Sequence, residues 1–122
     1  MRDFRKLAVW GEAHSLALAT YNMTSTFPRN EVNGLTSQIR RAAASIPSSI
    51  AEGCGRSEEG EFARFLQIAL GSTSQLEYLL LLARDLGFLP DSDYAEISDR
   101  ANHVKRMLIS FIARLGEAPG KS

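Results

Sequence analysis

Apolar residues recur every three or four positions along most of the chain, and the alternating pattern of a strand is absent. Pro28, the glycines of Gly-Cys-Gly (53–55) and Gly87 divide this pattern. The predicted helices span about residues 8–26, 34–52, 58–86 and 93–115, with Ser57 as the expected N-cap of the third. Four long helices with short connections predict one all-α domain, residues 1–122, folded as an antiparallel up-down-up-down four-helix bundle.

The third and fourth predicted helices carry more apolar side chains than one bundle core needs. Leu80, Leu81 and Leu82 widen the apolar stripe of the third helix, and Ile109 lies beside that of the fourth. Monomeric proteins rarely expose a large contiguous apolar patch, so we expect a homo-oligomer. The alternative is that the additional leucines lie under loops.

The second predicted helix has a polar side in addition to its apolar one. At 100° per residue, one arc, which we call the polar strip, contains Gln38, Arg41, Ser45, Ser48, Ser49, Glu52 and Arg56. Ile39, Ile46 and Ile50 occupy the adjoining arc, which we expect to face the core. Pro47, on a third side with Arg40, predicts a kink or a break because proline has no amide hydrogen for the helix.

The polar strip has two interpretations. It is either a solvated face, on which Glu52 and Arg56 form an i,i+4 ion pair, or a hydrogen-bonding surface for another subunit or a ligand. Gly71-Ser72, in the middle of the third predicted helix, favours the second interpretation. An interior glycine costs about 1 kcal/mol relative to alanine, so close approach of another helix is an expected reason for it. The alternative is a glycine that a long helix tolerates.

Composition narrows the classes of function. The 122 residues carry a formal net charge of zero, so no field of the whole molecule attracts nucleic acid or anionic lipid. The single cysteine, Cys54, excludes an intrachain disulfide and is expected in the core. We expect a cytoplasmic protein that does not enter membranes, because the sequence has no signal peptide and no apolar run long enough to span one.

The sequence contains no recognisable catalytic motif. Its two histidines, His14 and His103, lie on different predicted helices, and neither belongs to a Glu-x-x-His pair. Asp99 and His103 have i,i+4 spacing, which predicts a solvated ion pair more readily than half of a metal site. The sequence therefore predicts no enzyme, no cofactor and no metal.

Two long stretches nevertheless identify a family. The sequence QIRRAAASIPSSIAEGCGRS, followed by EFARFLQIALGSTSQLEYLLLLARDLGFL, resembles the four-helix-bundle proteins encoded in 23S rRNA intervening sequences. FRKLAVWGEAHSLALATY and FPRNEVNGLTSQIRRAA also fit, so the resemblance covers roughly residues 4–115. The chain residues in the family motif are Gln38, Arg41, Ser45, Glu52, Gly53, Arg56, Phe65, Ala69, Gly71, Ser72 and Glu77.

The resemblance extends to the accessory variability proteins of diversity-generating retroelements, which share the bundle. It implies a homopentamer, a barrel of five bundles around a central channel. It also implies RNA or DNA as a partner, and another protein such as a reverse transcriptase. The first hypothesis is therefore a non-enzymatic oligomer that contacts phosphates through Arg40, Arg41, Arg56 and Arg64. The second is an assembly or adaptor module whose polar strip contacts subunits or a protein partner, without nucleic acid.

Overall fold

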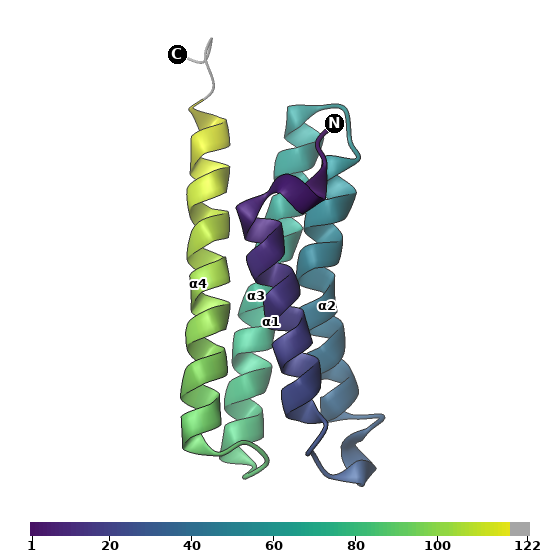
Figure 1. The fold of residues 1–122 in the computed structure, drawn as a ribbon, viewed down its shortest axis with the longest axis vertical. Helices are drawn as coiled ribbons and strands as arrows, with labels where there is room; N and C mark the ends of the chain where they lie inside the picture. Colours follow the sequence, from purple (N-terminus) through teal and green to yellow (C-terminus); the bar gives the residue numbers. More distant parts are fainter. Residues whose placement is uncertain (118–122) are drawn as a thin grey trace.

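The computed structural model describes residues 1–117 and consists of helices joined by short connections (Figure 1). Four α-helices, α1 (Ala8–Thr24), α2 (Leu35–Cys54), α3 (Glu59–Asp85) and α4 (Asp91–Gly116), follow one another, and the 3-10 turns η1 (Phe4–Lys6) and η2 (Arg29–Glu31) precede α1 and α2. No strand occurs among the described residues. The predictions of an all-helical chain and of four long helices are confirmed.

Each long helix packs against two others. Helix α2 contacts α1 and α3, and α4 contacts α3 and α1. In Figure 1 the α1–α2 and α3–α4 connections lie at the lower end, whereas the α2–α3 connection and the N-terminus lie at the upper end. Helices α2 and α4 therefore lie across the bundle from each other, each beside both α1 and α3.

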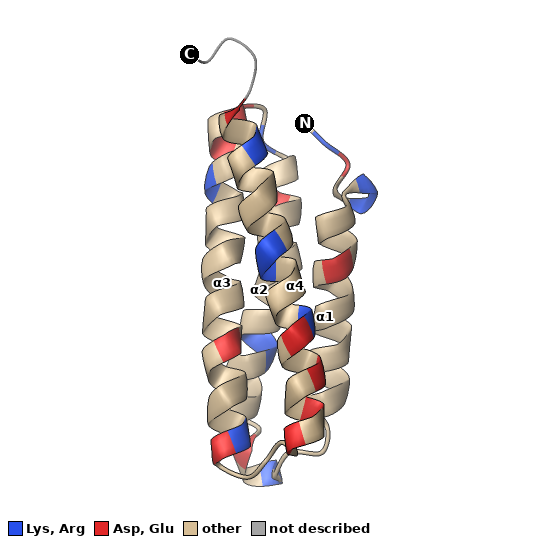
Figure 2. Cartoon of the chain, turned by 90° about the vertical axis from the view of Figure 1, so that its left-hand side faces the viewer, with Lys and Arg blue, Asp and Glu red and all other residues tan. Residues whose placement is uncertain are grey.

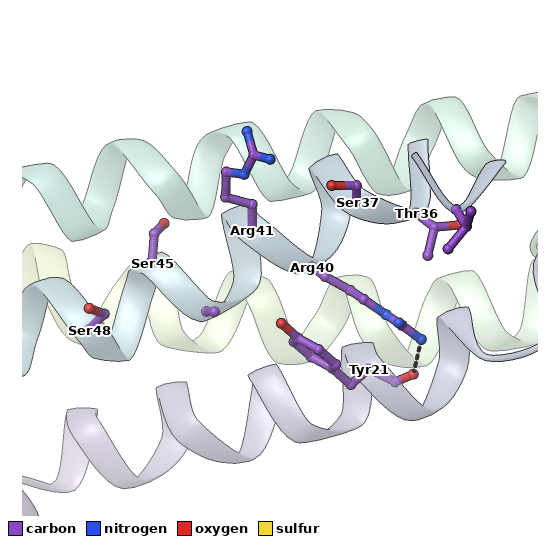
Figure 3. A pocket seen from close by; sticks show the side chains of 9 residues that line it. Tyr21, Thr36, Ser37, Arg40, Arg41, Ser45 and Ser48 are labelled. Atoms are coloured by element: carbon purple, nitrogen blue, oxygen red, sulfur yellow. Dashed lines mark hydrogen bonds between the residues drawn. The ribbon is translucent and has the colours of Figure 1, made fainter. Parts of the chain in front are cut away.

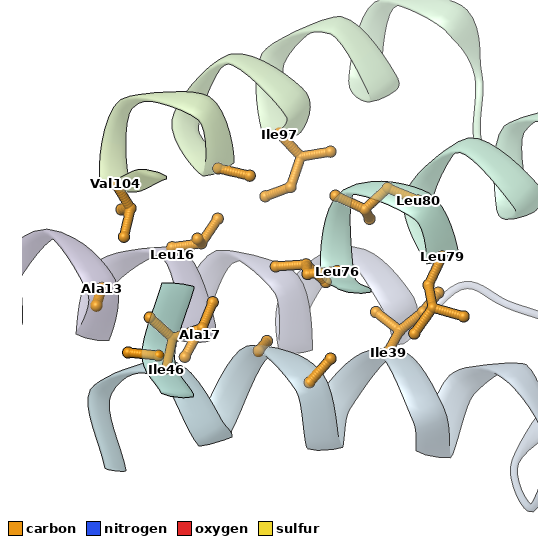
Figure 4. Packing of buried hydrophobic residues seen from close by; sticks show 14 of the residues in the cluster. Ala13, Leu16, Ala17, Ile39, Ile46, Leu76, Leu79, Leu80, Ile97 and Val104 are labelled. Carbon is orange, nitrogen blue, oxygen red and sulfur yellow. The ribbon is translucent and has the colours of Figure 1, made fainter. Parts of the chain in front are cut away.

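The core lies on the axis between the four helices (Figure 4). Leu16 of α1, Ile39 and Ile46 of α2, Leu76 of α3 and Leu108 of α4 are fully buried. Burial of each such side chain contributes about 1.5–3 kcal/mol. The predicted core positions of α2 are confirmed, and so is burial of Cys54, which is 1% exposed. The wide apolar stripes of α3 and α4 are only partly covered, because Leu81 and Leu82 are half-buried and Ile109 is 48% exposed.

The helix ends differ from the predicted ones by one or two residues. Helix α1 ends at Thr24, and the Thr24 hydroxyl donates a hydrogen bond to the Thr20 carbonyl at 2.9 Å. Ser57 is not the N-cap of α3, which is Glu58, and no side chain caps that end. Helix α4 begins directly after Pro90, whose fixed φ suits a helix start. The hydroxyl cap that the sequence predicted at the start of α3 is therefore absent.

Helix α2 continues without a break through Pro47 to Cys54, and Pro47 itself is buried. A break at this proline is excluded, and the kink stays a prediction. The close helix approach that Gly71 predicted lies instead at Gly53, where an added Cβ would be 2.8 Å from the Phe65 Cβ. An added Cβ at Gly71 would meet no atom within 4 Å. Within the described chain Gly53, and not Gly71, is therefore the glycine that lets two helices touch, and close approach of another subunit at Gly71 stays a prediction.

Candidate contact surface on helix α2

The polar strip lies on the outer side of α2. Gln38, Arg41, Ser48, Glu52 and Arg56 are exposed, as both interpretations of the strip require. Ser45 is half-buried, and its hydroxyl donates to the Ala42 carbonyl at 2.9 Å. Ser49 departs from the prediction, because only 9% of it is exposed. The strip is therefore continuous on the surface except at Ser49.

Two hollows flank the strip. The first, about 600 Å³, lies between α1 and α2 and includes Tyr21, Val32, Arg40, Arg41 and Ser48 in its lining (Figure 3). The second, about 520 Å³, lies toward α3 and is lined by Gln38, Arg41, Ala42, Ser45 and Gln75. Arg41 borders both hollows, and in Figure 3 its side chain points away from that of Arg40. Ser48 is one of several small residues of α2 that line the first hollow.

Arg40 is held by the end of α1. Its Nε donates to the Thr24 hydroxyl at 2.8 Å, and its Nη2 donates to the Tyr21 carbonyl at 3.2 Å (Figure 3). The guanidinium also lies 4.9 Å from the centroid of the Tyr21 ring. A cation at a helix C-terminus satisfies carbonyls that have no partner in the helix and interacts favourably with the helix dipole. Arg40 therefore joins α2 to α1, a structural role that the sequence did not indicate.

Arg56 and Arg64 both lie against one aromatic ring. Their guanidinium carbons are 4.9 and 4.7 Å from the centroid of Phe65. Each is paired with a carboxylate, Arg56 with Glu52 at 3.1 Å and Arg64 with Glu61 at 3.2 Å. The Arg64 bond lowers the pKa of Glu61 below its ordinary value, because it favours the charged carboxylate. The predicted Glu52–Arg56 pair is present, so two of the four candidate phosphate contacts already have anionic partners.

The structure does not bring the four arginines into one patch. Arg40 and Arg41 lie in the first half of α2, whereas Arg56 and Arg64 lie around the α2–α3 connection. The helix rises about 1.5 Å per residue, so roughly 20 Å of α2 separates Arg41 from Cys54. Within residues 1–117, Arg41 is the one of the four that has no ion pair and no hydrogen bond from its side chain.

The remaining motif residues support the packing of α3. Phe65 and Ala69 are buried, and Ser72 is half-buried beside the exposed Gly71. Glu77 accepts a hydrogen bond from the Lys105 Nζ at 3.0 Å, which joins α3 to α4. Most of this part of the motif therefore maintains the bundle.

Sequence reasoning missed several residues that line the two hollows. Tyr21 and Val32 border the first, and both are exposed large apolar side chains, at 44% and 57%. Thr36 also lines it, and its Oγ1 is buried with no hydrogen-bond partner among the described residues. No local pattern identifies these positions, because they come together only when α1 and η2 pack beside α2.

The histidine and cysteine side chains, which could take part in catalysis or metal binding, do not form a cluster. His14 stacks on Trp10, with ring centroids 4.9 Å apart, and His103 forms no ion pair with Asp99, so that predicted pair is wrong. Burial raises the pKa of the Cys54 thiol, which favours its neutral form. Over residues 1–117, no three histidine, cysteine or acidic side chains gather closely enough to hold a metal ion.

A membrane span is also missing from the described chain. None of its helices combines the length and the apolar character that crossing a bilayer requires.

Comparison with known proteins assigns the chain to a family. The family model of the 23S rRNA-intervening sequence protein matches residues 5–110, nearly all of the bundle. The chain belongs to this family. A crystal structure of a protein of unknown function from the S23 ribosomal protein family of Bacteroides thetaiotaomicron has the same fold, with a TM-score of 0.76 and 24% identity. The match covers 86% of this chain and 98% of that one. A search of curated proteins gave no match.

Proposed function

We propose that this member of the 23S rRNA-intervening sequence protein family is a non-enzymatic assembly module, an antiparallel bundle whose polar strip contacts further copies of the chain. The observation that carries the proposal is the first hollow. It combines exposed apolar side chains, Tyr21 and Val32, with small and polar groups of α2. A neighbouring helix would bury the apolar groups and find hydrogen-bonding partners in Arg41 and Gln38.

The partial exposure of α3 and α4 supports the same proposal. Ile68 and Tyr78 of α3 are exposed at 41% and 59%, and Ile109 of α4 at 48%. A closed ring would cover such surfaces on every copy, because each subunit of a cyclic oligomer presents two different faces to its neighbours. We propose a homopentamer, which is the assembly that the family resemblance implies.

The test is the mass of the assembly in sedimentation velocity experiments. Ser48→Arg places a long charged side chain in the first hollow, and the position is exposed, so the fold should tolerate it. We expect this variant to sediment as a smaller species than the wild type. Ser15→Arg, an equal change on the exposed side of α1, is the matched control and should sediment as the wild type does. Equal sedimentation of Ser48→Arg and wild type would contradict the proposal.

Nucleic-acid binding is the second candidate, and Arg41 is the observation that favours it. This guanidinium is exposed, without a partner within residues 1–117, and borders two hollows that a phosphate can enter. The other three arginines have intramolecular partners, so binding to RNA should depend mainly on Arg41. In a gel-shift titration, Arg41→Ala should weaken RNA binding and reduce its dependence on salt. Arg100→Ala is the control. Equal RNA affinity of Arg41→Ala and wild type would exclude this role for Arg41.

The cellular setting is part of the proposal. We place the protein in the cytoplasm, and a reverse transcriptase stays a predicted partner through the resemblance to retroelement accessory proteins. Co-purification with and without nuclease would separate a protein partner from one held through RNA.

A further inference from the structure

A third hollow lies on the far side of α1 from the polar strip. It is open to solvent, has a volume of about 480 Å³ and is lined by residues of η1, the start of α1 and the second half of α4. Its polar lining consists of Lys6, His103, Arg106, Ser110 and Arg114, and no carboxylate takes part. We call it the basic hollow. Its volume falls within the range of about 300–1,000 Å³ in which small-molecule sites are usually found.

The charge of the hollow comes from an uneven distribution along α4. Residues 91–99 hold four carboxylates and no base, whereas residues 100–114 hold four lysines or arginines, one histidine and no acid. In Figure 2 the acidic positions gather on the lower part of α4, and basic positions lie above them. This order suits the helix dipole, which favours anions at the N-terminus and cations at the C-terminus. The dipole does not, however, require that the cations converge on one hollow.

Six of the thirteen lysines and arginines among residues 1–117 are neutralised within the chain. Arg2, Arg5, Arg56, Arg64, Arg84 and Lys105 each have a carboxylate partner. Lys6 and Arg106, by contrast, form no ion pair and no side-chain hydrogen bond within residues 1–117, although they line the same hollow. Like charges that share a hollow repel one another, and a bound anion would relieve that repulsion.

The hollow also offers oriented hydrogen-bond donors. Arg114 Nη1 donates to the Ser110 Oγ at 2.8 Å, which holds both side chains and leaves the hydroxyl hydrogen of Ser110 for another acceptor. Ala8 and Val9 line the hollow as the first two residues of α1, and no side chain caps that helix. The first amides of a helix have no acceptor within it, so the N-terminal end of α1 is electropositive like the cationic side chains of the hollow.

One wall of the hollow is apolar. Val9, Met107 and the half-buried Phe111 form it, and the Phe111 ring is held edge-on against Phe62, with centroids 5.5 Å apart. An aromatic wall beside several cations suits a ligand that has a flat or apolar body and a compact anionic group. Inorganic anions alone would leave that wall in contact with water.

From these groups we propose that the basic hollow binds a phosphate ester of about the size of a mononucleotide. Arg106 and Lys6 contact the phosphate, Arg114 and Ser110 donate to its oxygens, and Phe111 contacts the organic body. Arginine provides two parallel donors that match phosphate oxygens, and lysine a point charge. The site shares no residue with the polar strip, so it does not depend on the proposed function.

The test uses AMP as the ligand and isothermal titration calorimetry on the full chain. Wild type should bind AMP and should not bind adenosine, which lacks the phosphate. Arg106→Gln should weaken AMP binding by about tenfold or more, because a charge-assisted hydrogen bond is lost. Arg100→Gln removes the same charge six residues away on α4, from a different hollow that contains Asp93 and Glu96, and should change the affinity less than twofold.

The source of the phosphate is decided by competition with oligouridylate. If oligouridylate displaces AMP, and if Arg106→Gln also weakens the binding of oligouridylate, the site is assigned to a phosphate of an RNA strand. AMP binding that persists in saturating oligouridylate would assign it to a free phosphate ester. The proposal is overturned if millimolar AMP does not bind, if adenosine binds equally well, or if Arg100→Gln and Arg106→Gln reduce affinity equally.

Discussion

Replacement of Gly53 by alanine tests the contact that joins α2 to α3. The added Cβ would lie 2.8 Å from the Phe65 Cβ and 3.3 Å from the Phe62 Cδ1. Ordinary carbon contacts are about 3.5–4.0 Å, and the Phe65 Cβ cannot move without its backbone. The two helices must therefore separate slightly along a tightly packed part of the core.

The expected loss of stability combines two opposing effects. Overpacking of a well-packed core costs about 1–3 kcal/mol, whereas alanine is favoured over glycine inside a helix by about 1 kcal/mol. These effects partly cancel, so Gly53→Ala should lower the free energy of unfolding by up to about 2 kcal/mol. Gly71→Ala is the matched control, because an added Cβ there meets nothing within 4 Å. It should raise the free energy of unfolding by about 0.5–1 kcal/mol.

Urea denaturation followed by far-UV circular dichroism measures both effects. All proteins must be compared at one chain concentration, since assembly adds to apparent stability. Gly53→Ala should be less stable than Gly71→Ala by about 1–3 kcal/mol, with unchanged m-values. A Gly53→Ala protein as stable as Gly71→Ala would refute the close approach. A destabilised Gly71→Ala protein would show that another molecule packs on α3 at that point.

Other predictions concern charges and the thiol. Arg40→Ala should lower the free energy of unfolding by about 1–2 kcal/mol, because its hydrogen bonds to Thr24 and Tyr21 are lost. Arg41→Ala should change the free energy of unfolding by no more than about 0.5 kcal/mol. Equal losses in urea denaturation would contradict the structural role of Arg40. The hydrogen bond from Arg2 lowers the pKa of Glu59. The stability that this bond contributes should be fully present above the ordinary pKa of a glutamate, about 4.3, and should be lost as pH falls through the lowered pKa. Glu59→Gln should flatten this part of the pH–stability curve, and an unchanged curve would argue against the bond. The Cys54 thiol, 1% exposed, should react with a disulfide reagent only after unfolding; rapid reaction of the folded protein would contradict its burial.

Much of the helical framework could be predicted from the sequence, because periodic apolar residues report burial directly. Ile39, Ile46 and Ile50 were expected in the core and are fully buried. Ser49 was expected on the polar strip and Pro47 on a third side of the helix, and both are buried. A helical wheel assigns a residue to an angle and ignores how closely a neighbour approaches. Tertiary contacts that a helical wheel does not contain therefore cover Pro47 and Ser49 as well.

The candidate site could be predicted only where it depends on local spacing. The Glu52–Arg56 pair follows from i,i+4 geometry and is present. The attachment of Arg40 to α1 could not be foreseen, since its acceptors lie 16 and 19 residues away in the sequence. The sequence predicts a close approach at Gly71 because this glycine lies in the middle of a helix, where glycine is unfavourable. Gly53 makes the approach, because the opposing Phe65 is known only from the tertiary structure.

Native mass spectrometry of the nuclease-treated wild-type protein tests self-association, the central claim, most directly. We expect a complex of about five times the chain mass of 13.4 kDa that persists on dilution and carries no nucleic acid. A single species at 13.4 kDa over the whole concentration range would contradict it.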